Sequence, residues 1–246
     1  MKNRFKRTIL TNIFSVIFLH FYTKRIAKKN IMPFADRYKF ASKYINKYHK
    51  SMNLEIMTYG MQNIDPNIKG CLIIGNHQGR TDCISVMHVL KDFPTSFVVA
   101  DNKSHRFLFS NVCDMLQAKR IKFDDLRSQA RVYSEMKNDI LKGQRFIIFP
   151  EAGYKDNKNA LQDFHTPAFS LAIKTKCPII PFCLYDSWKA YNKDYAGYYK
   201  LQFQCHILPP IYYDEYKDLN KRELAALVKS RIQNKLDEIK NNSLSQ

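Results

Sequence analysis

The chain has 246 residues, of which 45% are hydrophobic, enough for one globular domain with a sizeable core. Its formal net charge is +18, which favours an anionic partner such as a membrane surface, a nucleic acid or an acidic protein. A generally lysine-rich composition would give the same charge. The six cysteines form no CxxC pair, which argues against a disulfide framework and a zinc site. Only seven glycines are present and none lies in a glycine-rich phosphate loop, so a nucleotide-binding loop is not expected.

The first 51 residues differ in character from the rest. Lysines and arginines flank an apolar run at residues 9–22, which is shorter than the ~20 apolar residues of a spanning helix. No small-residue cleavage site follows it, so a secretory signal peptide is not expected. One helical face of this segment is polar: Thr8, Thr11, Asn12 and Ser15. The pattern predicts a helix in the membrane interface with its basic ends, Arg4 among them, near anionic headgroups. A core helix of the globular domain is the alternative.

A second helix is predicted at residues 36–51, and with the first it would form a hairpin against the membrane. Residues 1–51 are therefore predicted to be a membrane-associating helical segment, and residues 52–246 a separate domain. In that domain the predicted strands cover residues 54–59, 71–75, 96–100, 145–149, 179–184 and 200–207. The predicted helices cover residues 83–91, 106–116, 126–142 and 167–176, and a last helix begins near Lys221 after the N-cap Asn220. This alternation predicts an α/β fold with a mostly parallel central sheet flanked by helices.

The most informative motif, N-H-Q-G-R-T-D at residues 76–82, follows the predicted buried strand at residues 71–75. Acyl transfer from a thioester to an alcohol requires a base that takes the hydroxyl proton, and a neutral imidazole can do this. A carboxylate on the other ring nitrogen fixes the tautomer and stabilises the imidazolium that forms. We therefore predict His77 as the general base and Asp82 as its orienting partner. The alternatives are an ordinary loop histidine and a plain helix cap.

Two further segments follow in order: F-P-E-A-G at residues 149–153 and P-I-I-P at residues 178–181. Together with the first motif they resemble the glycerolipid acyltransferase family, which includes 1-acylglycerol-3-phosphate acyltransferases, over roughly residues 52–210. The resemblance implies that Glu151 helps to hold the glycerol portion of the acceptor. Ala152 stands where that family usually has glycine, and alanine disfavours positive φ. Either the turn is altered, or Gly153 takes the role of this glycine.

The match is poorest in the segment that binds the acceptor phosphate in this family. The family has a basic residue after the third strand and an arginine in a later segment. Here Phe123 falls at the position of that arginine. Lys103, Arg120, Lys122 and Arg127 are the candidates that remain to bind a phosphate. The acceptor therefore stays open between lysophosphatidic acid, another lysolipid and another alcohol.

The resemblance implies an O-acyltransferase of phospholipid synthesis at the cytoplasmic face of the cell membrane, bound peripherally or monotopically. It would move a fatty acyl group from acyl carrier protein or coenzyme A to a lysolipid hydroxyl, most simply that of 1-acylglycerol-3-phosphate. We expect no cofactor beyond the thioester co-substrate, and no metal.

Three other interpretations remain. The chain could be an inactive family member that serves as a membrane scaffold, or a hydrolase that uses water as the acceptor. It could also be a nucleic-acid-binding protein whose Tyr-, Phe- and Lys-rich residues 38–50 stack on bases. The last interpretation leaves His77, Asp82 and Glu151 without a role, so a nucleic-acid partner is not expected.

Overall fold

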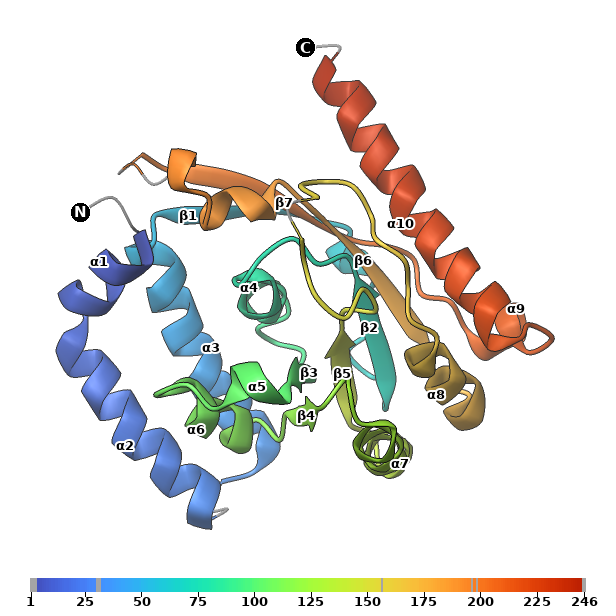
Figure 1. Ribbon diagram of the computed structural model, residues 1–246, viewed down its shortest axis with the longest axis horizontal. Coiled ribbons are helices and arrows are strands. Elements are labelled where there is room, and N and C mark those ends of the chain that lie inside the picture. Colours follow the sequence, from blue (N-terminus) through green and yellow to red (C-terminus); the bar gives the residue numbers. More distant parts are fainter. Residues whose placement is uncertain (1–3, 30–31, 156, 196, 198, 245–246) are drawn as a thin grey trace.

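The computed structural model describes residues 4–29, 32–155, 157–195, 197 and 199–244. Within them, seven strands form one sheet in the order β1-β7-β6-β2-β5-β3-β4, and every neighbouring pair is parallel except β6 and β7 (Figure 1). The strands are β1 (Leu54–Tyr59), β2 (Cys71–Gly75), β3 (Ser96–Ala100), β4 (Lys119–Ile121), β5 (Arg145–Ile148), β6 (Ile179–Tyr185) and β7 (Leu201–Ile207). This confirms the predicted fold class, although β4 was not predicted.

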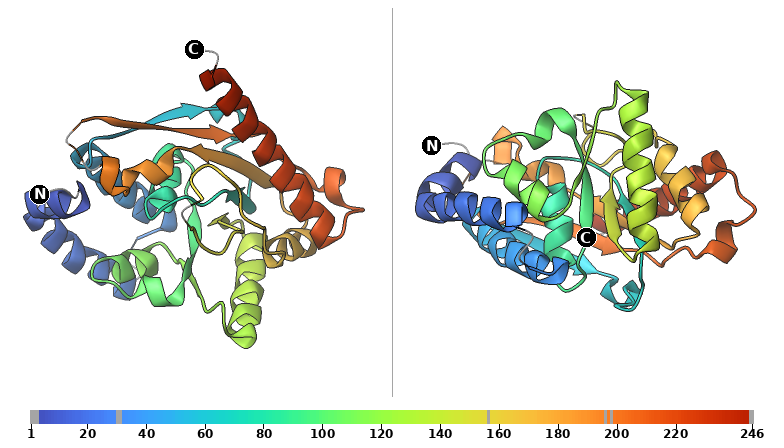
Figure 2. Two further views of the ribbon diagram at one scale, coloured as in Figure 1. Left: turned by 45° about the horizontal axis from the view of Figure 1, so that its top comes forward. Right: turned by 90° about the horizontal axis from the view of Figure 1, so that it is seen from below.

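Helices cover both faces of the sheet (Figures 1 and 2). They are α1 (Arg4–Thr11), α2 (Ile13–Lys29), α3 (Phe34–Ser51), α4 (Asp82–Val89), α5 (Asp101–Ser104), α6 (Phe109–Met115), α7 (Leu126–Leu141), α8 (Pro167–Thr175), α9 (Tyr213–Tyr216) and α10 (Lys221–Leu244). Three short 3₁₀ helices are η1 (Met61–Asn63), η2 (Ser187–Ala190) and η3 (Lys193–Tyr195).

The central strand β2 is buried on both faces, because its side chains alternate between two hydrophobic clusters. Leu72 and Ile74 belong to the cluster that includes residues of α7, α8 and α10. Cys71 and Ile73 belong to the cluster on the other face, which includes residues of α3, α4 and α6. The result is a three-layer α/β/α arrangement with β2 buried at its centre.

The N-terminal helices pack on this same second cluster. Ile26 of α2 and Tyr38 of α3 are fully buried in it. The Tyr38 hydroxyl also bonds to the carbonyl oxygens of Met87 and Leu90, at 3.2 and 3.1 Å, at the C-terminal end of α4. The N-terminal segment therefore shares a core with the helix that begins at Asp82.

The predicted single N-terminal helix is divided at Asn12 into α1 and α2. On its polar face Thr8 is buried and Asn12 and Ser15 contact α3, whereas Thr11 is exposed. The Asn12 amide donates to the Ser51 hydroxyl at 3.0 Å, and the Lys47 ammonium donates to the Ser15 hydroxyl at 2.6 Å. The prediction that Arg4 lies near headgroups is wrong. Its guanidinium is buried and donates to the backbone carbonyls of Met52 and Tyr195, both at 2.9 Å, which replace the solvent.

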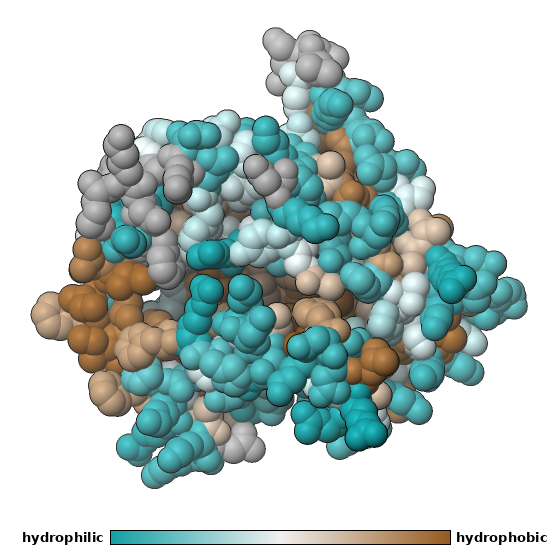
Figure 3. Space-filling model, in the orientation of Figure 1, coloured by the Kyte–Doolittle hydropathy of each residue, from teal (hydrophilic) through white to brown (hydrophobic). Residues whose placement is uncertain are grey.

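The opposite face of the helix pair is apolar and exposed. We call it the N-terminal apolar face; it consists of Leu10, Ile13, Phe14, Ile17, Phe18 and Phe21. Figure 3 shows apolar side chains gathered on the side of the molecule where α1 and α2 lie. In the described part of the chain, no helix is both long enough and apolar enough to cross a membrane. Contiguous exposed apolar surface of this kind marks interaction sites for proteins or membranes.

Candidate active site

The candidate site lies where β2, β5 and β6 end. These strands are adjacent and parallel, so their carboxyl ends meet at one edge of the sheet. The motif at residues 76–82 follows β2, the segment with Glu151 follows β5, and η2 with Ser187 follows β6. Open α/β sheets bind their ligands outside this edge.

His77 and Asp82 form the pair that the sequence predicted. The Nδ1 atom of His77 lies 2.8 Å from Oδ2 of Asp82. Because an ionised carboxylate only accepts hydrogen bonds, Nδ1 carries the proton, and the neutral ring keeps its lone pair on Nε2. The imidazole is 17% exposed, and Nε2 has no hydrogen-bond partner among the described residues. The contact with Asp82 thus fixes the tautomer and leaves Nε2 available to accept a hydrogen bond.

The Asp82 carboxylate is fully buried and is held by several donors. Besides His77, Oδ2 accepts from the backbone amides of Gln78 at 2.5 Å and Gly79 at 2.7 Å. Oδ1 accepts from the Ser187 hydroxyl at 2.8 Å. The four residues between His77 and Asp82 therefore form a loop that closes on the carboxylate at the start of α4. These bonds offset the cost of burying a charge and leave the carboxylate one orientation.

Asn76 and Gln78, on either side of His77, attach the loop to β6. The Asn76 side chain donates to the Leu184 carbonyl at 2.8 Å and accepts from the Leu184 amide at 2.7 Å. The Gln78 amide group also donates to the Leu184 carbonyl, at 2.9 Å. The loop is therefore fixed to the sheet on both sides of the imidazole.

Glu151 supports His77 from the β5 side. Its Oε1 accepts from the His77 backbone amide at 3.0 Å, and its Oε2 accepts from the backbone and side-chain amides of Gln162 at 3.2 and 2.7 Å. Glu151 is 6% exposed, and this burial raises the pKa of its carboxyl group above the ordinary value. Both oxygens are thus already bonded to the protein, and the visible role of Glu151 is to position His77. Its predicted contact with the acceptor glycerol stays a prediction.

In the turn after β5, Gly153 does not take the role of the glycine that usually follows Glu151, because its φ of 159° is that of extended backbone. Ala152 itself adopts the left-handed conformation, with a φ of 56°, so the methyl group does not prevent the turn. The carbonyl oxygen of Gly153 accepts from the Gln162 side chain at 3.0 Å, which ties Gly153 to the residue that holds Glu151. Just before the turn, the Phe149 ring stacks on the His77 imidazole, with centroids 4.3 Å apart.

Arg120, one of the basic residues predicted to bind a phosphate, lies away from His77. Arg120 is in β4, three strands from β2, which is roughly 14 Å at normal strand spacing. Its guanidinium donates to Ser104 Oγ at 2.9 Å, to the Ser110 carbonyl at 3.1 Å and to Asp114 at 2.6 Å. Lys103 and Lys122 are exposed, in α5 and just after β4. None of the hydrogen bonds and ion pairs of the described residues joins Lys103, Arg120 or Lys122 to the loop that carries His77.

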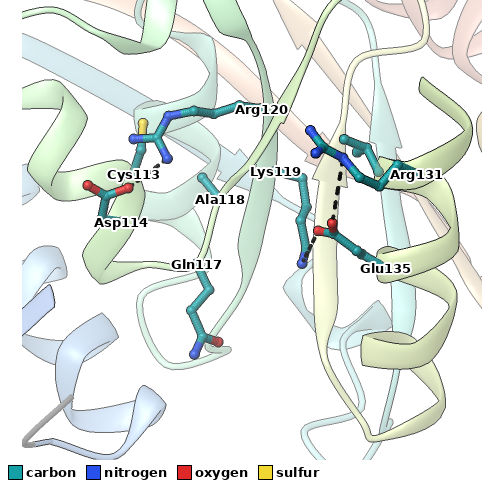
Figure 4. A pocket seen from close by; sticks show the side chains of 9 residues that line it. Cys113, Asp114, Gln117, Ala118, Lys119, Arg120, Arg131 and Glu135 are labelled. Atoms are coloured by element: carbon teal, nitrogen blue, oxygen red, sulfur yellow. Dashed lines mark hydrogen bonds and ion pairs between the residues drawn. The ribbon is translucent and has the colours of Figure 1, made fainter. Parts of the chain in front are cut away.

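Arg120 does line a pocket of about 340 Å³, which we call the β4 pocket (Figure 4). Its other charged side chains are Asp114, Lys119, Arg131 and Glu135. Each of its cations has an acidic partner: Arg120 pairs with Asp114, whereas Lys119 and Arg131 both pair with Glu135. A phosphate would have to displace these carboxylates, so the β4 pocket is poorly suited to bind one.

Sequence reasoning missed several residues that contact the site. Ser187 contacts Asp82 from 105 positions further along the chain, and Gln162 contacts Glu151 from within a loop. The Tyr154 ring packs edge-on against His77, with centroids 4.7 Å apart, and its hydroxyl accepts from Arg80 Nε at 3.2 Å. Ser187 and Gln162 carry no local signal. Tyr154 and Arg80 lie next to the motifs, and that proximity was the only available sign.

Comparison with known proteins agrees with this geometry. The model of the family described as "Acyltransferase" matches residues 55–185, slightly more than half of the chain. The chain therefore belongs to the acyltransferase family, and its resemblance to glycerolipid acyltransferases is confirmed.

Among solved structures, the chain is similar to the 1-acyl-sn-glycerophosphate (LPA) acyltransferase PlsC from Thermotoga maritima. The TM-score is 0.73 at 16% identity, and the match covers 96% of this chain and 97% of that one. At this identity the likeness establishes the fold alone. A search of curated protein sequences gave no significant match.

Proposed function

We propose that the protein transfers a fatty acyl group from a thioester to the free hydroxyl of a lysolipid, with 1-acylglycerol-3-phosphate as the acceptor. The observation that carries this proposal is the His77–Asp82 pair, with its contact of 2.8 Å, in a chain of the acyltransferase family. The donor would be acyl carrier protein or coenzyme A in its acylated form. Both are acidic, which suits a chain with a net charge of +18.

In the proposed reaction, Nε2 of His77 takes the proton of the acceptor hydroxyl as its oxygen attacks the thioester carbonyl carbon. Asp82 stabilises the imidazolium formed in this step. The tetrahedral intermediate then collapses, the carbon–sulfur bond breaks, and the thiolate takes the proton from Nε2. The ester product and the free thiol leave, and the imidazole returns to its starting state. General base catalysis of this kind contributes roughly 10²–10⁴-fold to the rate.

We propose that the reaction occurs at the cytoplasmic face of the cell membrane, with the N-terminal apolar face inserted among the lipids. Two features support this. Phe14 and Phe21 in α2 are 86% and 67% exposed, although water is an unfavourable environment for them. Lysines and arginines at the end of α2, among them Lys28 and Lys29, would attract anionic headgroups at about 1 kcal/mol each. A lysolipid acceptor would then reach the protein from the bilayer.

The test is to incubate the purified protein with a labelled acyl thioester and a panel of lysolipids in mixed micelles. We expect thiol release together with a diacyl product, and we expect His77→Ala to abolish both while its thermal unfolding stays unchanged. Gln204→Ala, on β7, is a control that should retain full activity. Full activity of His77→Ala would refute the proposed mechanism.

The other interpretations give different results in the same experiment. Thiol release without a diacyl product would indicate a hydrolase that uses water. No turnover with any acceptor, in a folded protein that binds vesicles, would indicate a membrane scaffold. Steep salt-dependent affinity for RNA without lipid binding would indicate a nucleic-acid-binding protein.

A further inference from the structure

A second pocket, of about 330 Å³, lies beside the loop that carries His77. We call it the Arg80 pocket; its side chains are Arg80, Tyr154, Lys155, Trp188 and Tyr191, next to the backbone at Gln78 and Gly79. It thus adjoins the His77–Asp82 loop, the turn after Glu151 and the 3₁₀ helix that follows β6. The reaction steps above give Arg80 no role, although it lies within the motif at residues 76–82.

Arg80 is held close to the imidazole by Tyr154. The Tyr154 ring packs against the His77 ring, with centroids 4.7 Å apart, while its hydroxyl accepts from Nε of Arg80 at 3.2 Å. The guanidinium carbon also lies 5.9 Å from the centre of the Tyr191 ring. Arg80 is therefore separated from the base by one tyrosine side chain, and aromatic rings contact it on two sides.

The charge of the Arg80 pocket differs from that of the β4 pocket. In the part of the chain that the structure describes, neither Arg80 nor Lys155 forms an ion pair, and both are exposed. By contrast, the arginines and the lysine of the β4 pocket each have a carboxylate partner (Figure 4). An anion can therefore bind in the Arg80 pocket without displacing an existing partner.

Trp188 also lines the Arg80 pocket. The indole Nε1–H of Trp188 is buried and has no hydrogen-bond partner among the described residues. Because this atom is fully buried, it does not open into the pocket, and the exposed cations Arg80 and Lys155 are the groups available to an anion. The Lys158 ammonium lies 5.4 Å from the centre of the Trp188 ring and adds to the local positive potential, whereas Lys189, at 5.7 Å, is paired with Asp186 at 2.7 Å.

We propose that the Arg80 pocket binds a phosphate monoester of the substrate and that Arg80 is its principal ligand. The free ends of a guanidinium match phosphate oxygens in a bidentate manner. In a glycerol 3-phosphate headgroup, one methylene and one ester oxygen separate the reacting carbon from the phosphorus. This short spacing suits a base and an arginine held apart by one tyrosine ring. The inference rests on the proposed function and replaces Lys103, Arg120 and Lys122 as the phosphate ligands.

The same chemical group occurs in two substrates: the headgroup of a lysophosphatidic acceptor and the 3′-phosphate of coenzyme A. Kinetics on Arg80→Gln separate them. If the acceptor phosphate binds here, KM for 1-acylglycerol-3-phosphate rises about 10- to 100-fold, whereas KM for a monoacylglycerol is unchanged. If the donor phosphate binds here, KM for acyl-coenzyme A rises and that for acyl-dephospho-coenzyme A does not. In both cases kcat changes little. Arg222→Gln, an exposed arginine in α10, is the matched control.

A binding measurement that needs no turnover separates this inference from the proposed function. Glycerol 3-phosphate and adenosine 3′,5′-bisphosphate are tested for their ability to raise the Tm of the His77→Ala protein. We expect at least one of them to do so, and we expect Arg80→Gln to remove the effect while Arg222→Gln keeps it. This result would support the pocket even if no lysolipid were acylated.

Two outcomes would overturn the inference. One is a Tm increase that persists in Arg80→Gln. The other is a phosphate-dependent KM that responds to Lys122→Gln and leaves Arg80→Gln equal to the wild type, as the sequence alone predicts. Since Arg80 is exposed, its substitution should not affect folding, and equal Tm values without ligand check this.

Discussion

Phe14 gives the sharpest test of membrane binding. Its side chain is 86% exposed, the largest exposed fraction among the large hydrophobic residues of α1 and α2 whose side chains the structure describes. A phenylalanine buries roughly 200 Å² when fully covered, so about 170 Å² is available, and at about 25 cal/mol per Å² this gives at most about 4 kcal/mol. Partial insertion reduces the gain to about 2 kcal/mol. Phe14→Asn should therefore lower the partition coefficient about 30-fold.

The assay is co-sedimentation with vesicles that contain an anionic phospholipid, with the bound fraction measured over a range of lipid concentrations. Leu126→Asn is the matched control, because Leu126 is 81% exposed but lies in α7, on the other side of the sheet. Both substitutions should leave thermal unfolding nearly unchanged. Equal binding of Phe14→Asn and wild type, or an equal loss in Leu126→Asn, would refute the assignment of this face to the membrane.

Three further predictions concern the interior. Ser187→Ala should lower kcat about tenfold or more without changing KM, since the Asp82 carboxylate loses a charge-assisted hydrogen bond. An unchanged kcat would show that the backbone amides of Gln78 and Gly79 are enough to orient Asp82. Ala152→Gly should raise the free energy of unfolding by about 1 kcal/mol in urea titrations, because φ is 56°. Burial lowers the pKa of His49 to about 4, so below pH 6.5 the folded state binds fewer protons than the unfolded chain. The free energy of unfolding should therefore fall, by up to about 3 kcal/mol, as the pH is lowered from about 6.5 to about 4. His49→Gln should make the free energy of unfolding less dependent on pH in this range.

The central strands were predictable because buried parallel strands are continuous apolar runs. β2 has the predicted bounds, and so do β1 and β3. The start of α10 was also predictable from its capping residues. Asn220 Oδ1 accepts from the Glu223 backbone amide at 3.2 Å, and the Glu223 carboxylate accepts from the Asn220 backbone amide at 2.8 Å. β4 was missed because it has three residues, two of them basic, at the sheet edge.

The break between α1 and α2 was missed for a physical reason as well. No proline or glycine marks it, and the position of Asn12 fits the polar face of one continuous helix. In the structure the Asn12 side chain bonds both to the Thr8 carbonyl, at 2.9 Å, and to Ser51. Ser51 lies 39 positions away, so this contact depends on how α3 folds back.

The candidate site likewise has local contacts, which the sequence predicted, and contacts between distant residues, which it did not. His77 and Asp82 are five positions apart, so their proximity could be read from the sequence. Arg120 was an attractive phosphate ligand on charge alone, yet Ser104 and Asp114 occupy its donors. Composition shows how many cations a chain has, and only the fold shows which of them already have partners.

The buried residues around His77 are expected to affect turnover only by positioning its imidazole. This expectation can be tested with a double variant. Ser187 reaches the ring through Asp82, and Glu151 reaches it through the backbone amide of His77. If these residues affect the reaction only through His77, substituting them should cause no further loss of turnover in a protein that already lacks the imidazole. We expect Ser187→Ala to slow the wild type but to leave the residual rate of His77→Ala unchanged. A further loss in the double variant would mean that Ser187 acts on the substrate directly, and it would then be a ligand of the acceptor or of the developing oxyanion.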